Sequence, residues 1–192
     1  MCVNHLSVEK IKEEVIKKYS GSKRLTHILG VASLAKSLAK KYGLDETKAE
    51  IAGLLHDYCK YESIEEMKRI IGDQMIIDKF KDAPQIYHAY ASRVMAEKKF
   101  GITDSEILLG IQNHVYGRIG MSLFEKILVI SDFAEDSREY ENCRKVRSIL
   151  DSGDFNKAMY LCIKYTIDAV IANHNKPMEE QYIILKELEK LL

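Results

Sequence analysis

The chain has 192 residues, of which 46% are hydrophobic and 30% charged, with 29 Lys and Arg balancing 29 Asp and Glu and only 2 Pro and 10 Gly. A chain of this size and composition can bury a core of its own, which excludes a disordered or collagen-like protein and predicts one globular domain. Because a formal net charge of zero provides no general attraction for polyanions, we expect neither a nucleic acid nor an acidic membrane as a partner.

The cysteines are scattered and show no CxxC pair: they are Cys2, Cys59, Cys143 and Cys162. This spacing favours reduced thiols over a disulfide framework or a zinc knuckle. The N-terminus has no apolar signal-like region, and no stretch approaches the roughly 20 apolar residues of a membrane span. The sequence therefore predicts a cytoplasmic protein, and it leaves a monomer and a homodimer both open.

Apolar residues recur with the period of an α-helix along nearly the whole chain, and no segment has the pattern of a strand. The first strongly periodic segment covers 24–43 and is predicted to end at Gly43, a residue type that favours the position just after a helix. Asp45 is predicted to cap the next helix, which runs through the apolar segment 49–58.

Further helix starts follow from capping signals. Pro84 is predicted to open a helix through Ala96, and Pro177 to open the last helix, because proline loses no hydrogen bond at the first helical position. Three other starts are predicted by the pattern S/T-x-x-E, in which both side chains satisfy free backbone donors. The pairs with this pattern are Ser63 with Glu66, Thr103 with Glu106, and Ser122 with Glu125.

Near the C-terminus, Gly153 and Asp154 separate a charged helix over 138–150 from a long apolar one. No repeat, linker or change of composition divides the chain. We therefore predict an all-α bundle of about eight to ten helices that forms a single domain over 1–192.

Four of the six histidines occupy positions from which helices could present them to a common centre: His27, His56, His88 and His114. A single histidine on an apolar helix is more often a core residue than a ligand, so the argument depends on the set. His56 and Asp57 together close an apolar run, and two such groups are costly to bury unless a charge receives them. Asp132 lies in an apolar helix, where it is either salt-bridged or a ligand. Imidazole and carboxylate donors suit Fe, Mn, Zn, Co or Ni, and the lack of nearby cysteine ligands argues against structural zinc.

These residues stand in a recognisable order: Arg24-x-x-His27, His56-Asp57, His88 in APQIYHAYA, His114 in IQNHVYG and Asp132 in ILVISDFAED. The set resembles the HD-domain superfamily of metal-dependent phosphohydrolases. More narrowly, it resembles the YqeK family of bacterial enzymes that cleave diadenosine tetraphosphate symmetrically. The resemblance extends from about Lys23 to about Arg147 and includes Glu135. The chain departs from the family pattern at Val115, where threonine is usual, and at Asp136, where proline is usual.

The resemblance implies a two-metal centre. His27, His56 and Asp132 would hold one ion, His88 and His114 the second, and Asp57 would bridge both. Iron is the implied metal, with Mn, Co, Ni and Zn as alternatives. Two such ions would activate a shared water as hydroxide and clamp phosphoryl oxygens, so that diadenosine tetraphosphate gives two ADP. The implied HD core covers about 23–138, with the helices of about 139–192 packed on it.

A polyphosphate substrate also needs positive charge around it. Lys60 follows His56 by about one helical turn and is the candidate for a catalytic, phosphate-binding ammonium; the alternative is a solvated helix end. Arg118 and Arg138 offer planar forks to phosphate oxygens, although either could instead form a structural ion pair. Arg24 is interpreted first as structural, paired with a carboxylate behind the ligands. Five tyrosines near these motifs could stack on adenine, of which Tyr116 is the candidate: Tyr58, Tyr61, Tyr87, Tyr90 and Tyr116.

Three other functions remain open from the sequence. An HD phosphohydrolase with the same centre could act on a nucleoside mono-, di- or triphosphate, because the shape of the pocket decides that preference. A nucleotide-binding regulatory module could keep the ligands without turnover. A helical interaction domain could pack the histidines in its core.

Overall fold

The computed structural model describes residues 7–192, and helices form all of the regular structure there. The all-α prediction is confirmed. Residues 7–192 contain eleven α-helices and one short 3-10 helix, so the predicted range of about eight to ten is slightly low. The six residues of α5 (Gln74–Lys79) are too few to show a helical period, which explains part of the difference. The other helices are α1 (Val8–Tyr19), α2 (Lys23–Lys41), α3 (Glu46–Leu55), α4 (Ile64–Ile71), η1 (Pro84–Ile86), α6 (Tyr87–Lys98), α7 (Ser105–Asn113), α8 (Leu123–Ala134), α9 (Glu141–Asp151), α10 (Phe155–Ala172) and α11 (Glu179–Glu189).

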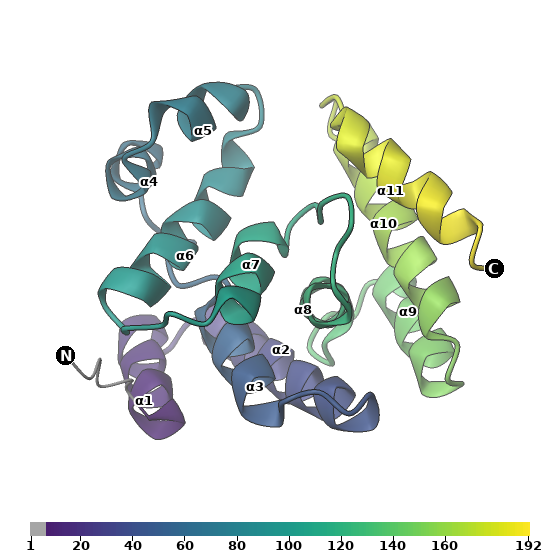
Figure 1. Cartoon of the computed structure of the whole chain (residues 1–192), viewed down its shortest axis with the longest axis horizontal. Helices are drawn as coiled ribbons and strands as arrows, with labels where there is room; N and C mark the ends of the chain where they lie inside the picture. The colour runs from purple at the N-terminus through teal and green to yellow at the C-terminus, as the bar shows by residue number, and fades with distance from the viewer. Residues whose placement is uncertain (1–6) are drawn as a thin grey trace.

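Helix α8 occupies the middle of the bundle and is seen end-on in Figure 1. It packs against α2, α3 and α7 on one side and against α9 and α10 on the other. Helices α4 and α5 lie beyond α6, and α11 packs on α10 (Figure 1). Helices α9 and α10 therefore cover the side of α8 opposite α2, α3 and α7, and α11 packs outside them on α10.

Helices α2 and α3 approach each other closely because Gly53 has no side chain. A Cβ atom at Gly53 would lie 2.5 Å from the Cα of Ala32, which is too close for any real contact. The end of α2 and the start of α3 follow the sequence prediction, but α3 ends at Leu55 and does not continue through residue 58. Gly43 has a φ of 71° and follows the last turn of α2, and the Asp45 carboxylate accepts hydrogen bonds at the start of α3.

The predicted helix starts at Ser63 and Ser122 are confirmed, but only Ser122 and Glu125 form a complete capping box. Ser63 caps α4 alone, because the Glu66 carboxylate accepts from Arg69. The pair of Thr103 with Glu106 is wrong. Asp104 caps α7 instead, and its carboxylate accepts from two backbone N–H groups at the start of the helix. Both residue types are good caps, so the sequence alone does not separate neighbouring candidates.

The predicted roles of the two prolines need correction. Pro84 opens the short 3-10 helix, and α6 itself begins at Tyr87. Pro177 precedes α11 by two residues, because Met178 is the capping residue and its N–H donates to the Gln181 side chain. The break at Gly153 and Asp154 is confirmed between α9 and α10.

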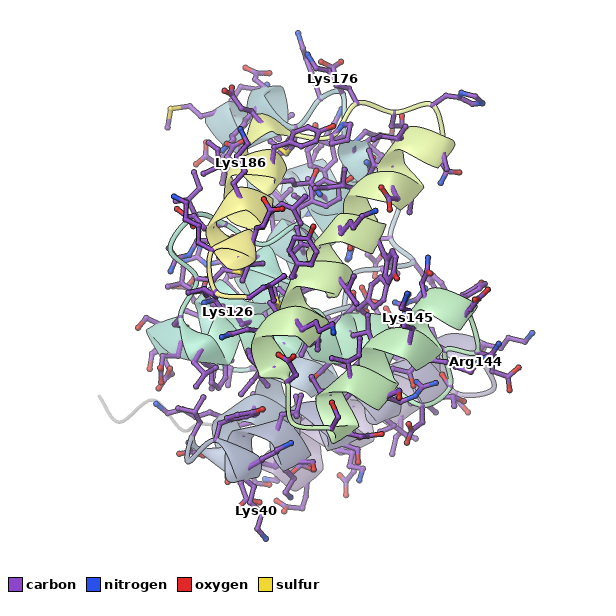
Figure 2. All side chains as sticks on the ribbon, turned by 90° about the vertical axis from the view of Figure 1, so that its right-hand side faces the viewer. Lys40, Lys126, Arg144, Lys145, Lys176 and Lys186 are labelled. Carbon is purple, nitrogen blue, oxygen red and sulfur yellow. The ribbon has the colours of Figure 1, made fainter. Side chains whose placement is uncertain are left out.

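The outer surface carries basic side chains on several separate elements. Figure 2 shows them spread from Lys176 to Lys40 across the side that includes α9–α11. Among the described residues, no helix is both long and apolar enough to cross a bilayer. Cys59, Cys143 and Cys162 are buried and free, whereas Cys2 and His5 lie outside the described residues.

Candidate functional site

Five helices bring the predicted ligands together. His27 comes from α2, His88 from the first turn of α6 and Asp132 from α8. His56 and His114 each follow the last residue of a helix, α3 and α7, and Asp57 lies in the turn after α3. The four histidines and Asp57 are at most 6% exposed, whereas the Asp132 side chain is 21% exposed. The centre is thus buried and reaches the surface beside Asp132.

Asp57 lies between two pairs of imidazoles and turns one oxygen to each pair. Its Oδ2 is 3.4 Å from His56 Nε2 and 3.7 Å from His27 Nε2. Its Oδ1 is 3.0 Å from His88 Nε2 and 3.7 Å from His114 Nε2. A carboxylate in this position can donate one oxygen to each of two ions.

The remaining donor atoms have similar spacings. Asp132 Oδ1 lies 3.0 Å from His27 Nε2 and 3.7 Å from His56 Nε2. The two Nε2 atoms within each pair of histidines are 3.3 Å apart for His27 and His56 and 3.2 Å apart for His88 and His114. Ligands at about 2.1 Å from one ion are separated by roughly 3.0–3.4 Å in octahedral or tetrahedral geometry. The donor atoms therefore have the spacing of ligands that share an ion.

The other ring nitrogen of each histidine is held by an acceptor. Nδ1 of His56, His88 and His114 lies 2.6–2.7 Å from the carbonyl oxygen three residues earlier in the chain. Nδ1 of His27 lies 3.1 Å from Glu135 Oε1. Because carbonyl and carboxylate oxygens only accept, each Nδ1 carries the proton, and in the neutral ring Nε2 keeps its lone pair for a metal.

Glu135 contacts His27 directly, and the predicted set of site residues omits it although the sequence pattern contained it. Its Oε2 accepts from the backbone N–H of Ser137 at 2.7 Å, and its Oε1 accepts from the Ser137 hydroxyl at 2.6 Å. The carboxylate is therefore fixed before it meets His27. A side chain that orients a ligand leaves no spacing pattern in the sequence. Here the contact joins His27 of α2 to Glu135, the residue after α8, and the two are far apart in the chain.

At His56, His88 and Asp57 the electrostatics favour the protonation states that a metal requires, whereas at His27 they favour the protonated ring. Burial lowers the pKa of His56, and it lowers that of His88 to about 4, which favours neutral rings. Burial alone would lower the pKa of His27, but the Asp132 and Glu135 carboxylates outweigh it and raise that pKa. Burial would likewise raise the pKa of Asp57, but the imidazoles that face it, His56 first, hold it well below its usual range.

An unsatisfied atom indicates that the centre suits a cation. Asp57 Oδ1 is buried and has no hydrogen-bond partner among the described residues, because the nearby His88 Nε2 bears no proton when its Nδ1 donates to Gln85 O. Two groups of donors share Asp57: one with His27 and His56, the other with His88 and His114. Four imidazoles with two carboxylates fit divalent transition metals.

Three cationic side chains surround the ligands. Lys60 Nζ lies 3.2 Å from His88 Nε2 and 3.8 Å from Asp57 Oδ1. Helix α3 does not continue to Lys60; a turn closed by the Lys60 N–H and the Asp57 carbonyl places it there. Arg138 Nη2 lies 2.9 Å from Asp132 Oδ1. Arg24 was expected to pair with a carboxylate behind the ligands, but its Nη1 contacts Asp57 Oδ2 itself at 2.6 Å.

Arg118 and Tyr116 lie farther from the donor atoms. The guanidinium of Arg118 donates to both oxygens of the buried Glu125 carboxylate, with Nε 2.7 Å from Oε1 and Nη2 2.7 Å from Oε2. Tyr116 is buried, and its hydroxyl accepts a hydrogen bond from Gln85. Neither side chain contacts the six ligands, so the roles of Arg118 and Tyr116 in substrate binding stay predictions.

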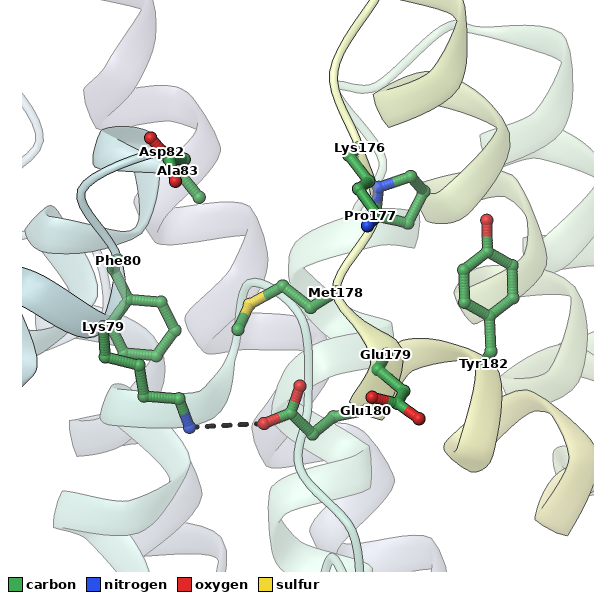
Figure 3. A pocket seen from close by; sticks show the side chains of 10 residues that line it. All are labelled: Lys79, Phe80, Asp82, Ala83, Lys176, Pro177, Met178, Glu179, Glu180 and Tyr182. Carbon is green, nitrogen blue, oxygen red and sulfur yellow. Dashed lines mark ion pairs between the residues drawn. The ribbon is translucent and has the colours of Figure 1, made fainter.

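Two cavities differ in their relation to this centre. The larger, of about 470 Å³, lies between the residues that follow α5 and the start of α11, and Figure 3 shows Lys79 paired there with Glu180. None of the six predicted ligands lines it. A smaller cavity of about 240 Å³ includes His27, Arg24 and Arg138 in its wall and so opens on the centre.

Comparisons with known proteins agree with this geometry. The family model of the HD domain matches residues 24–154. The chain is 34% identical over 164 residues to the symmetrical bis(5'-nucleosyl)-tetraphosphatase of Bacillus subtilis, covering 85% of this chain and 87% of that one. The enzyme of the same name from Halalkalibacterium halodurans is 32% identical over 166 residues, or 86% and 88% of the two chains. A crystal structure from Clostridium acetobutylicum, described as a predicted HD superfamily hydrolase involved in NAD metabolism, superposes with a TM-score of 0.88 at 32% identity, covering 98% of this chain and all of that one.

Proposed function

The chain belongs to the HD-domain family, and we propose that it is a metal-dependent hydrolase that cleaves diadenosine tetraphosphate symmetrically into two ADP. The observation that carries the proposal is the complete convergence of four imidazoles and two carboxylates, with Asp57 turning one oxygen to each pair of histidines. Relatives named for this reaction align with this chain over most of both lengths.

In this proposal His27, His56 and Asp132 would hold one ion, His88 and His114 would hold the other, and Asp57 would contribute one oxygen to each. Two bound divalent ions supply an activated water near neutral pH and positive charge for the phosphoryl oxygens. We infer iron as the native metal from the family resemblance, with Mn, Co, Ni and Zn as the alternatives that the same donors accept.

The protein side chains position the polyphosphate and neutralise its charge. Arg24 and Arg138 reach the two ligand carboxylates from the side of the smaller cavity, where their remaining N–H groups can bind phosphate oxygens. Lys60 lies on the side of His88 and can stabilise charge that develops on the oxygen between the two central phosphorus atoms. The oxygen of water forms a bond to one central phosphorus and a proton of the water passes to solvent, the bond from that phosphorus to the bridging oxygen breaks, and that oxygen leaves on the second ADP.

The direct test is a product assay on protein purified anaerobically and supplied with iron or manganese. Symmetrical cleavage gives ADP alone, and in ¹⁸O-labelled water one of the two ADP molecules carries one label. Equal amounts of AMP and ATP would contradict symmetrical cleavage. Absence of turnover with every divalent metal would contradict the proposal that the protein is an enzyme. A panel of nucleoside mono-, di- and triphosphates tests whether the protein prefers diadenosine tetraphosphate to the alternative substrates within the family. The cytoplasmic location and the homodimer stay predictions.

A further inference from the structure

Two exposed tyrosines border the small cavity that opens on His27. Tyr61 is 63% exposed and Tyr140 is 75% exposed, and both line this cavity. They come from different parts of the chain, since Tyr61 follows α3 and Tyr140 immediately precedes α9. By contrast, the sequence candidate Tyr116 is only 6% exposed. The aromatic surface available to a ligand at the centre is therefore supplied by Tyr61 and Tyr140.

The ring of Tyr61 is held in place relative to the bridging carboxylate. It packs against the edge of Tyr19, with ring centroids 5.5 Å apart and planes at 64°. The Tyr19 hydroxyl donates to the carbonyl oxygen of Asp57 at 2.9 Å. One buried side chain thus connects the position of Tyr61 to that of Asp57, and a ligand that stacks on Tyr61 meets a ring that is already oriented.

Positive charge connects the centre to these rings. Arg24 and Arg138 line the cavity and contact the ligand carboxylates, and the Arg24 guanidinium lies 6.0 Å from the centroid of the Tyr61 ring. Lys23 also lines the cavity and is exposed. Cations beside exposed aromatic rings are the groups that bind a phosphate chain ending in a nucleobase.

We propose that Tyr61 and Tyr140 form the stacking site for one nucleobase of the substrate and that Lys23 contacts the phosphates next to it. This inference rests on the proposed function and assigns one end of the dinucleotide to this cavity. The volume of about 240 Å³ is below the roughly 300–1,000 Å³ that encloses a drug-sized ligand, so the cavity accommodates one end of the substrate. Every base has a face that can stack, so this site does not distinguish bases by the hydrogen-bonding groups on their edges. Purines offer the larger ring area and are expected to bind more tightly than pyrimidines.

Steady-state kinetics with diadenosine tetraphosphate test the proposal on the metal-loaded full chain. Tyr61→Ala and Tyr140→Ala are each expected to raise KM roughly 5- to 100-fold with little change in kcat, because stacking binds ground state and transition state alike. Tyr61→Phe and Tyr140→Phe keep the aromatic ring, so their KM should stay close to that of the parent protein. Tyr182→Ala is the matched control, since Tyr182 is 41% exposed but lines the other cavity (Figure 3). Equal effects of Phe and Ala, or unchanged KM in both Ala variants, would overturn the stacking site.

A binding measurement separates this inference from the proposed function. The chain contains no tryptophan, so Tyr61→Trp would introduce a single tryptophan whose emission can be excited selectively over that of the tyrosines. We expect ADP to quench the tryptophan emission of the Tyr61→Trp variant and inorganic pyrophosphate to leave that emission unchanged. The emission of the control variant Tyr182→Trp should change with neither ligand. Quenching by ADP in a protein that does not cleave the dinucleotide would refute the proposed function and support the base site. Cleavage without quenching, or equal quenching by pyrophosphate, would refute the base site alone.

Discussion

The Glu135 carboxylate packs directly against the backbone of Gly30. A Cβ atom at residue 30 would clash with Glu135 Oε2 and lie 3.1 Å from its Cδ, so the space beside α2 exists only because residue 30 is glycine. Glu135 cannot easily move away, because the N–H and hydroxyl of Ser137 also hold it. The contact between Gly30 and Glu135 therefore sets the position of the acceptor that orients His27.

From this relationship we predict that Gly30→Ala displaces Glu135 and lowers metal affinity about 10- to 100-fold, the usual effect of losing the partner that orients a ligand. The helix itself should tolerate the change, since alanine is the better helix former. Titration of metal-free protein, with bound metal measured by elemental analysis, gives the affinity.

Glu135→Ala should lower metal affinity to a similar extent. The double variant Gly30→Ala/Glu135→Ala should lose little more affinity than either single variant, because both substitutions remove the same hydrogen bond to His27. Fully additive losses would show that Gly30 acts in some other way.

Replacing Asp57 with Ala should abolish stable binding of both ions and all hydrolysis, because this carboxylate faces both pairs of histidines. Metal content per chain after dialysis is the measurement. Asp136→Ala is the control: its side chain is 98% exposed and it is also acidic. Unchanged metal content and activity in Asp57→Ala would refute the assigned bridge.

Gly53→Ala should destabilise the fold by about 1–3 kcal/mol, since the new methyl group would meet the backbone of Ala32 at 2.5 Å and force α2 and α3 apart. Urea denaturation of the two proteins measures the difference. Gly110→Ala is a milder comparison, because its methyl group would meet only side-chain atoms of Phe124 and Leu128 at 3.2–3.3 Å, which can shift. A larger loss at Gly110 than at Gly53 would contradict this account.

Stability should depend on pH through Glu125. Burial raises its pKa, but hydrogen bonds from Arg118, the Ser122 N–H and Asn113 outweigh burial and lower the pKa below its ordinary value. A carboxyl with a lowered pKa in the folded state contributes stability above its unfolded pKa of about 4.3 and loses that contribution as the pH falls through the folded pKa. Glu125→Gln should therefore cost more stability at pH 7 than at pH 3.

Urea denaturation at both pH values measures the Glu125 contribution. The control is Glu187→Gln, since Glu187 is an exposed residue of α11. A constant difference between parent and Glu125→Gln across this pH range would show that the Glu125 carboxyl does not titrate as described.

Much of the fold could be predicted from local signals. Helix ends at Gly43, Asp45, Ser63 and Ser122 depend on one residue and its immediate neighbours, so the pattern was sufficient there. Errors arose where two neighbouring residues compete for one role, as at Thr103 and Asp104, where the carboxylate became the cap. Proline constrains its own backbone but does not decide how many residues later a helix begins, which explains the shift at Pro177.

Sequence alone determined the all-α class and predicted the six candidate donors that the structure brings together, because helical periodicity is local and the order of histidines and aspartates is characteristic of one family. Tertiary structure alone decided how those donors are oriented. The approach of Glu135 to Gly30, the contact of Arg24 with Asp57, and the exposure of Tyr61 in place of Tyr116 each join segments that are distant in the chain. Such contacts depend on how helices pack, and packing is a property of the assembled core that no single segment encodes.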